Sequence, residues 1–270
     1  KIEKINLQLL TLDIQNIKKL SSIIKPSNFS RILNNNIIRG TINAELEFFL
    51  NDKNNIDDFI IKGEANNLDA NFLKDINLRN TKLSFFADRS DILIKSIFGE
   101  LDKIKINDGD IKLRLTPNLT LESNFYSILK LEDQSLKKYA ENSDNFKFAK
   151  SLKNIHAELN NNLLITFDKT YKIKKFNFET SGEVNKVNLS FNENFKNDFL
   201  KDFNSLSIKN SKIKAVYASD KKNVSFSGNY STDNQDFFPF LLNTDFSEKF
   251  LNVIMEFDFK KSLDIDLLNY

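Results

Sequence analysis

Alternation of apolar and polar residues with a period of two is the feature that most constrains this chain. In residues 42–48 the even positions hold Ile, Ala, Leu and Phe, whereas the odd positions hold Asn or Glu. Successive side chains of a β-strand point to opposite faces of a sheet, so the pattern predicts a strand with one apolar and one solvated face. The pattern recurs in residues 59–65, 81–85, 92–98, 111–115, 119–121, 155–159, 176–178, 187–191, 213–217, 224–226, 253–259 and 263–267.

The connections and the interruptions complete the predicted fold. Short polar connections, such as residues 51–55 and 88–90, favour antiparallel hairpins. Three stretches break the alternation and predict helices, namely residues 15–34, 129–152 and 234–250. The expected fold class is therefore mainly β, with tandem repeats of an antiparallel sheet and interspersed short helices.

Parts of the first half of the chain return in the second half. Residues 42–46 match residues 155–159, residues 78–83 match residues 208–213, and residues 94–99 correspond to residues 224–228. We expect residues 1–14 to be the last strand of a preceding unit, 15–125 a first repeat, 126–231 a second and 232–270 the start of a third. Such a repeat predicts that the chain is a piece of a longer array.

The composition argues against an enzyme, a metal site or a cofactor. The 270 residues include no Cys, a single His, 6 Gly and 3 Pro. His156 is expected on the solvated face of a strand without a Ser or Cys partner, and Asp108-Gly109-Asp110 is expected to be a hairpin turn. The net charge of +2 provides no basic surface for nucleic acid. No run of about 18 apolar residues is present that would span a bilayer.

An apolar sheet face must be covered by something. A dozen strands at about 4.8 Å spacing form a sheet about 60 Å wide, of which three helices would cover about half. The residues leave two readings open for the rest of that face. It is either an ordinary core closed by another part of the sheet or a groove filled by acyl chains.

Four segments resemble the AsmA-like superfamily, in particular its YhdP-like and TamB-like members in Gram-negative envelopes. They are Gly40-Thr-Ile-Asn-Ala-Glu-Leu46, Phe59-Ile-Ile-Lys-Gly-Glu-Ala-Asn-Asn-Leu68, Leu78-Arg-Asn-Thr-Lys-Leu83 and Ile94-Lys-Ser-Ile-Phe-Gly99. The resemblance implies a long curved antiparallel sheet that forms an open hydrophobic groove. It implies a periplasmic, bridge-like protein that carries phospholipid between the inner and outer membranes. It also implies an inner-membrane anchor outside these residues and a role in outer-membrane biogenesis.

These observations lead to one expected function and one alternative. The expected function is a segment of a lipid-transfer protein, without catalysis or cofactor, whose groove binds phospholipid acyl chains. The alternative is a structural or protein-binding β-repeat scaffold of the envelope, with a self-buried core and envelope proteins as partners. The residues expected to line the groove are Leu46, Phe48, Phe59, Ile61, Leu83, Phe85, Ile94, Phe98, Phe178, Leu189, Phe191, Ala215, Tyr217 and Phe226.

Overall fold

The structure, a computed structural model, consists almost entirely of β-strands. It describes residues 3–23, 31, 34–73, 76–115, 117–132, 135–136, 151–170, 172–191, 204–233, 236–246 and 250–258. The described elements are β1 (Lys4–Asp13), α1 (Ile14–Ile23), β2 (Ile37–Leu50), β3 (Ile56–Leu73), β4 (Ile76–Ala87), β5 (Asp91–Leu101), β6 (Ile104–Arg114), β7 (Thr120–Glu132), β8 (Leu152–Phe167), β9 (Ile173–Ser190), β10 (Ser205–Ala218), β11 (Lys222–Thr232), β12 (Phe238–Phe246) and β13 (Leu251–Phe257).

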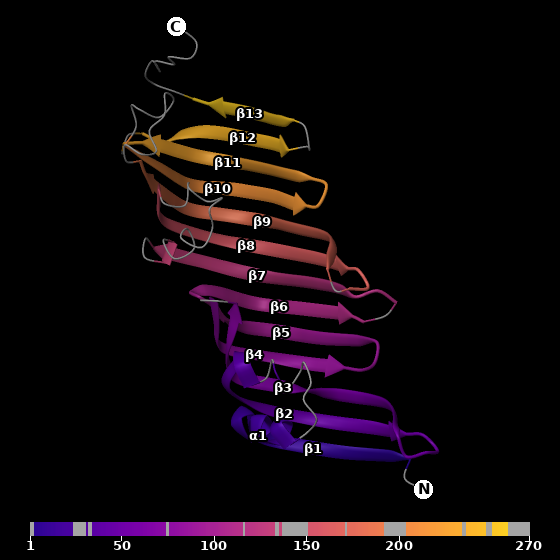
Figure 1. The fold of residues 1–270 in the computed structure, drawn as a ribbon. Coiled ribbons are helices and arrows are strands. Elements are labelled where there is room, and N and C mark those ends of the chain that lie inside the picture. The colour runs from indigo at the N-terminus through magenta and orange to yellow at the C-terminus, as the bar shows by residue number, and fades with distance from the viewer. Residues whose placement is uncertain are drawn as a thin grey trace. The chain divides into compact units, whose positions relative to one another are not determined.

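The strands are hydrogen-bonded in chain order, from β1 to β13 (Figure 1). Pairing is antiparallel from β1 to β6 and from β9 to β13. β1 and β13 stand at opposite ends of this order, so the described sheet is open. The prediction of a mainly β, antiparallel and open fold is thus confirmed.

The chain divides into two compact units, and each is described by itself. Unit 1 consists of Lys1–Tyr126 and Asn162–Phe176, and unit 2 consists of Ser127–Asn161 and Asn177–Tyr270. In each unit we call one side of the sheet the apolar face. In unit 1 it carries the cross-strand row Leu9, Ala44, Gly63, Phe85 and Ile94. In unit 2 it carries the cross-strand row Gly182, Ile213, Phe226, Leu242 and Met255. The opposite side of each unit is the mixed face.

In unit 1 a line of irregularities crosses the strands at one level. Register shifts fall between Leu9 and Leu12 in β1, between Ala65 and Leu68 in β3, and between Ile94 and Ile97 in β5. The line coincides with non-glycine residues of positive φ, which are Thr11, Asn67, Asn80, Ser96 and Asp108. An extra residue in one strand bends it and increases its twist, so this bulge line bends the sheet of unit 1.

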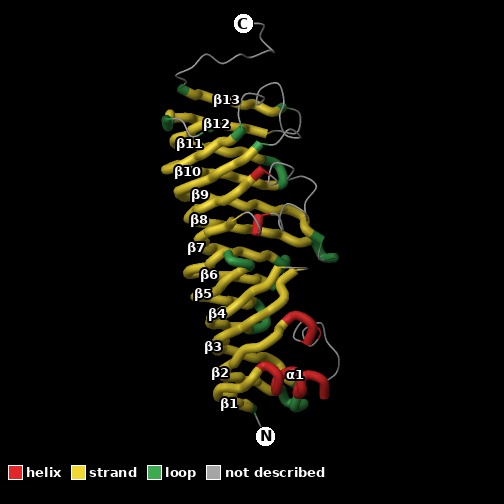
Figure 2. The backbone as a smooth tube through the Cα atoms, turned by 90° about the vertical axis from the view of Figure 1, so that its left-hand side faces the viewer, coloured by secondary structure: helices red, strands yellow, loops and turns green. Residues whose placement is uncertain are grey.

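Helix α1 confirms the first part of the predicted helix 15–34. It begins where β1 ends, and the Asp13 Oδ1 accepts a hydrogen bond from the Gln15 backbone N–H at 2.7 Å, as an N-cap does. Gln15 Nε2 donates to the Ile38 carbonyl at 2.6 Å, which ties the helix to β2. The helix therefore lies beside one end of β1 and β2 (Figure 2).

The other two predicted helices are not confirmed. The stretch 234–250 was expected to be helical, but residues 238–246 form β12, so this prediction is wrong. A short run rich in Phe and Leu is compatible with the period of a helix and with that of a strand. β11 provides backbone hydrogen-bond partners along the whole of residues 238–246, which makes them a strand. Residues 129–132 of the predicted second helix continue β7, and most of its remaining residues lie outside the described ones. The predicted strand 263–267 also lies outside the described residues.

Candidate ligand-binding face

The apolar face of unit 1 gathers seven of the predicted groove residues. Phe48 pairs directly with Phe59, and Leu46 with Ile61, across β2 and β3. Directly opposed residues of antiparallel strands point to the same side of a sheet, so these rows share one face. The register places seven predicted residues on it, namely Leu46, Phe48, Phe59, Ile61, Leu83, Phe85 and Ile94.

Large side chains on this face keep contact with solvent. Each of the seven is half-buried, whereas the buried apolar residues of unit 1 are Ile14, Ala44, Ala65, Ala70 and Ile97. Among the described residues, no second layer of side chains buries the large apolar groups of this face. It thus offers apolar surface whose burial by a ligand would contribute about 25 cal/mol per Å².

Phe98 was expected on the same face, and that prediction is wrong. Phe98 pairs with Lys82, so it points to the mixed face, where it is 45% exposed. The cause is the bulge at Ser96, whose φ is +52°. The extra residue shifts the alternation by one position, and Ile97 takes the buried place instead.

Unit 2 has a closed core at one level of its apolar face. Ala157, Val184, Val187, Leu189 and Phe191 form a buried cluster against which side chains of β7, β8, β10 and β11 pack. Leu189 is 2% exposed and Phe191 is 9% exposed. The prediction that these two residues line an accessible groove is therefore wrong.

The remaining predicted residues of unit 2 are accessible. Phe178 pairs with Tyr217 across β9 and β10, and Ala215 pairs with Val224 across β10 and β11. Phe178, Ala215 and Phe226 are half-buried, and Tyr217 is exposed. They lie on the same face, because Tyr217, Ala215 and Ile213, which is the partner of Phe226, alternate along β10.

Aromatic side chains extend that face toward β13. The ring centroid of Phe226 lies 5.1 Å from that of Phe240, with the rings edge to face. Tyr230 contacts Phe240 at 6.2 Å and Phe257 at 5.4 Å in the same geometry. Edge-to-face pairs of this kind add about 0.5–1.5 kcal/mol each to area burial. Phe226 therefore contributes to stability as well as to the surface.

Several residues of the apolar faces were not predicted. Ile5, Leu7 and Leu9 of β1 pair with Phe48, Leu46 and Ala44, and their alternation was visible in the sequence. Leu242 and Met255 pair with each other on the apolar face of unit 2. Leu242 was missed because its segment was interpreted as a helix.

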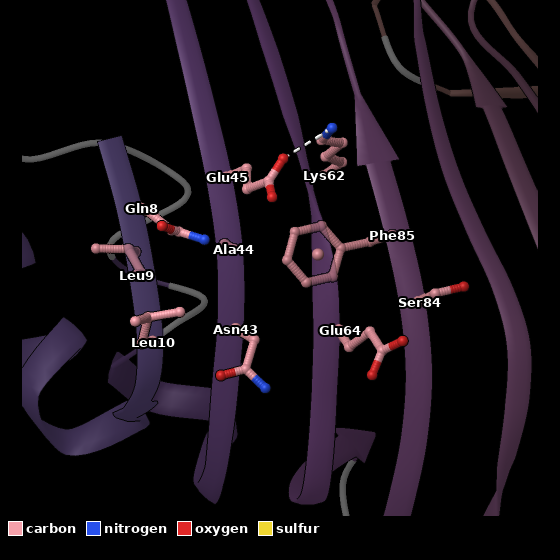
Figure 3. A pocket seen from close by; sticks show the side chains of 11 residues that line it. Gln8, Leu9, Leu10, Asn43, Ala44, Glu45, Lys62, Glu64, Ser84 and Phe85 are labelled. Atoms are coloured by element: carbon pink, nitrogen blue, oxygen red, sulfur yellow. Dashed lines mark ion pairs between the residues drawn. The ribbon is translucent and has the colours of Figure 1, made fainter. Parts of the chain in front are cut away.

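Unit 1 contains a hollow of about 430 Å³ between β1 and β4 (Figure 3). Its lining includes the mixed-face residues Asn43, Glu45, Lys62, Glu64 and Ser84. It also includes four positions of the apolar-face row, namely Leu9, Ala44, Gly63 and Phe85. The hollow is therefore lined by residues of both faces of the sheet.

Two charged groups of the hollow form an ion pair. Lys62 Nζ lies 2.8 Å from Glu45 Oε2. The hydrogen bond to Glu45 raises the pKa of the Lys62 ammonium above its ordinary value. A second hollow, in unit 2, is lined mainly by mixed-face residues such as Glu179, Lys214, Asn223 and Asp245.

A charge row crosses the mixed face of unit 1 beyond the bulge line. Arg39 pairs with Asp69 across β2 and β3, while Arg79 pairs with Glu100 across β4 and β5. Asp69 is buried, and its Oδ2 lies 2.6 Å from Arg39 Nε and 3.4 Å from Arg79 Nη1. This arrangement satisfies the carboxylate internally and makes it a structural ion pair.

The described residues offer no arrangement for metal binding. No group of three His, Cys, Asp or Glu side chains among them is placed to hold a metal ion. His156 Nε2 lies 3.2 Å from Glu132 Oε1, an exposed pair at the strand surface. Within the described part of the chain, no helix has the length and hydropathy to cross a membrane.

Comparison with known proteins adds no relative. No protein-family model, curated protein or solved structure matches the chain.

Proposed function

We propose that this chain is a segment of a bridge-like lipid-transfer protein of the Gram-negative periplasm, with acyl chains bound on its apolar faces. The supporting observation is the row structure of unit 1, where Leu46, Phe48, Phe59, Ile61 and Phe85 lie together and half-buried. Their residue type and accessibility suit hydrocarbon, which needs apolar contact and no polar partner. The AsmA-like resemblance supports the same reading, and with it an inner-membrane anchor elsewhere in the protein.

Binding of an acyl chain would be weak and would have similar strength everywhere on the apolar face of unit 1, which forms an apolar strip across the strands. Neighbouring strands lie about 4.8 Å apart, so an acyl chain crossing them would exchange one set of similar contacts for the next. No charged side chain in the rows of Leu46 and Phe85 would hold it at a single position. Movement along the strip would then be diffusive and would require no chemical step.

The alternative function is a scaffold with a self-buried core that binds envelope proteins. One observation favours it, namely the closed cluster around Leu189 and Phe191 in unit 2. If the apolar face of unit 1 is also covered by protein, lipid will not reach it. The experiment below separates the two functions.

A photoactivatable phospholipid tests the proposal directly. The full chain is mixed with vesicles that contain the probe, irradiated and digested, and the labelled residues are identified by mass spectrometry. Labels are expected on β2, β3 and β4 at Phe48, Phe59 and Phe85. An unlabelled chain, or labels spread equally over both faces, would contradict lipid binding on the apolar face.

Two adjacent phenylalanines provide a matched pair of variants. Phe85 pairs with Gly63 and Ile94 on the apolar face, whereas Phe86 pairs with Lys62 and Leu93 on the mixed face. Both are half-buried, so Asp at either position replaces the same side chain at similar burial. Phe85→Asp is expected to reduce lipid labelling strongly and Phe86→Asp to leave it nearly unchanged. Equal loss in both variants would indicate unfolding and would argue against the proposed face.

A further inference from the structure

The apolar face of β10–β13 carries one charge among its described positions. The cross-strand rows of this face are Ile213, Phe226, Leu242 and Met255, then Ala215, Val224, Thr244 and Val253, then Tyr217, Lys222, Phe246 and Leu251. Lys222 is the one Lys, Arg, Asp or Glu residue in these rows. It stands in the last row, at the end of the strands next to the turn that joins β10 to β11.

The neighbours of Lys222 in its row are large, apolar and accessible. Its Nζ lies 4.8 Å from the centroid of the Tyr217 ring, a cation–π contact. Tyr217 is 51% exposed, Phe246 40% and Leu251 57%. An ammonium group therefore stands at the border of an open apolar surface.

No carboxylate of the described residues forms an ion pair with Lys222. The acidic residue nearest to it in sequence, Asp220, is exposed in the turn, and Asp245 belongs to the mixed face because it pairs with Asn223. The positive charge of Lys222 is thus available to a ligand that lies on the apolar face.

From Lys222 the apolar surface continues along β11. Val224, Phe226 and Gly228 follow on the same side, and Gly228 lies about 20 Å along the strand from Lys222. We infer that this face binds an amphiphile with an anionic headgroup, the headgroup at Lys222 and the hydrocarbon chain along β11 toward Phe226. This inference rests on the proposed function and adds the charge class and the orientation of the ligand.

Single-chain amphiphiles that differ in headgroup test the inference. Binding of laurate, dodecyl phosphate, dodecyl maltoside and dodecyltrimethylammonium to the full chain is measured by calorimetry below their micelle concentrations. The two anions are expected to bind more tightly than the neutral and cationic amphiphiles. Lys222→Gln is expected to weaken binding of the anions about threefold to fivefold, the size of one exposed charge pair.

Lys221→Gln is the matched control, because it removes the same charge from the neighbouring, exposed residue of the turn. It is expected to leave the preference for anions unchanged. If all four amphiphiles bind equally and Lys222→Gln has no effect, charge selection at Lys222 is wrong while apolar binding stands. If none of the four binds and the photolabelling of unit 1 also fails, the proposed function itself is wrong.

Discussion

Gly228 lies against Ser211 so closely that a Cβ atom built on the glycine would stand 1.9 Å from the Ser211 Oγ. The same relationship occurs in unit 1, where a Cβ on Gly99 would stand 2.3 Å from the Thr81 Oγ1. Only glycine fits opposite these hydroxyl residues without a shift of the backbone or of the neighbour. The two units therefore share one local packing arrangement, in which a glycine lies against the side chain of a Ser or Thr on the neighbouring strand.

The arrangement also includes a residue whose backbone has a positive, left-handed φ. Asn80 (φ +47°) precedes Thr81, and Asn210 (φ +48°) precedes Ser211. In both cases the hydroxyl donates to the carbonyl oxygen two residues earlier, at 3.1 Å for Thr81 and 2.9 Å for Ser211. Each arrangement lies at a register shift, between β4 and β5 in unit 1 and between β10 and β11 in unit 2. The sequence match of residues 78–83 with 208–213 thus corresponds to a shared bulge.

Gly228→Ala is expected to destabilise the chain by about 1–3 kcal/mol, because the added methyl group overpacks the contact with Ser211. The free energy of unfolding from urea denaturation measures this effect. Ser211→Gly in the same chain is expected to recover part of the loss, since it removes the nearest atom. Gly109→Ala is the control, as its Cβ would lie 3.2 Å from the nearest atom, a side-chain carbon of Ile97. A larger loss for Gly109→Ala than for Gly228→Ala would contradict this account.

The bulge at Ser96 is tested by a pair of adjacent substitutions. Ile97→Asp places a charge at a position that is 9% exposed and is expected to cost about 2–4 kcal/mol. Phe98→Asp places it at a position that is 45% exposed and is expected to cost less than about 1 kcal/mol. Thermal or urea unfolding of both variants provides the comparison. If the alternation of β5 continued through Ser96 without a bulge, Phe98→Asp would cost more unfolding free energy than Ile97→Asp.

The Asp69 carboxyl predicts an acid-dependent loss of stability. Burial would raise its pKa, but the Asn80 backbone N–H at 2.8 Å and the guanidinium groups of Arg39 and Arg79 outweigh burial and lower the pKa. A lowered pKa in the folded chain means that the charge stabilises the fold at neutral pH. This contribution is lost as the pH falls below about 4 toward the folded-state pKa.

Asp69→Asn is therefore expected to be destabilised by about 1–3 kcal/mol near pH 7 and to lose less stability on acidification than the parent chain. The measurement is the free energy of unfolding as a function of pH. Parallel curves for the two chains would mean that Asp69 has the same pKa in the folded and unfolded states.

A buried amide in unit 2 predicts a further stability effect. Asn161 donates from Nδ2 to the Ser127 Oγ at 2.9 Å and accepts at Oδ1 from the Thr180 Oγ1 at 2.9 Å. Asn161→Ala leaves the buried Ser127 hydroxyl and the half-buried Thr180 hydroxyl without the amide, and it is expected to cost about 1–3 kcal/mol. Adding Ser127→Ala and Thr180→Val is expected to return part of this energy. If the triple variant is less stable than the summed losses of its three single variants predict, the hydrogen-bond network is not the cause of the Asn161→Ala effect.

Much of the candidate surface was predictable from local pattern. Leu46, Phe48, Phe59 and Ile61 lie in uninterrupted alternation, and all four share the apolar face. Phe98 was misplaced because a bulge of one residue changes the side on which every later residue of the strand lies. Leu189 and Phe191 were expected to be accessible, yet alternation says only which side a residue faces and not what packs against it.

The order of apolar and polar residues was sufficient to establish the strands and their antiparallel succession, because that order is a local property of each segment. It was also sufficient to relate Asn80-Thr81 to Asn210-Ser211. The bulge line, the strand conformation of residues 238–246 and the closed cluster of unit 2 depended on contacts between segments. Register and burial are collective properties: β11 supplies the hydrogen bonds that make residues 238–246 a strand, and neighbouring strands bury Leu189.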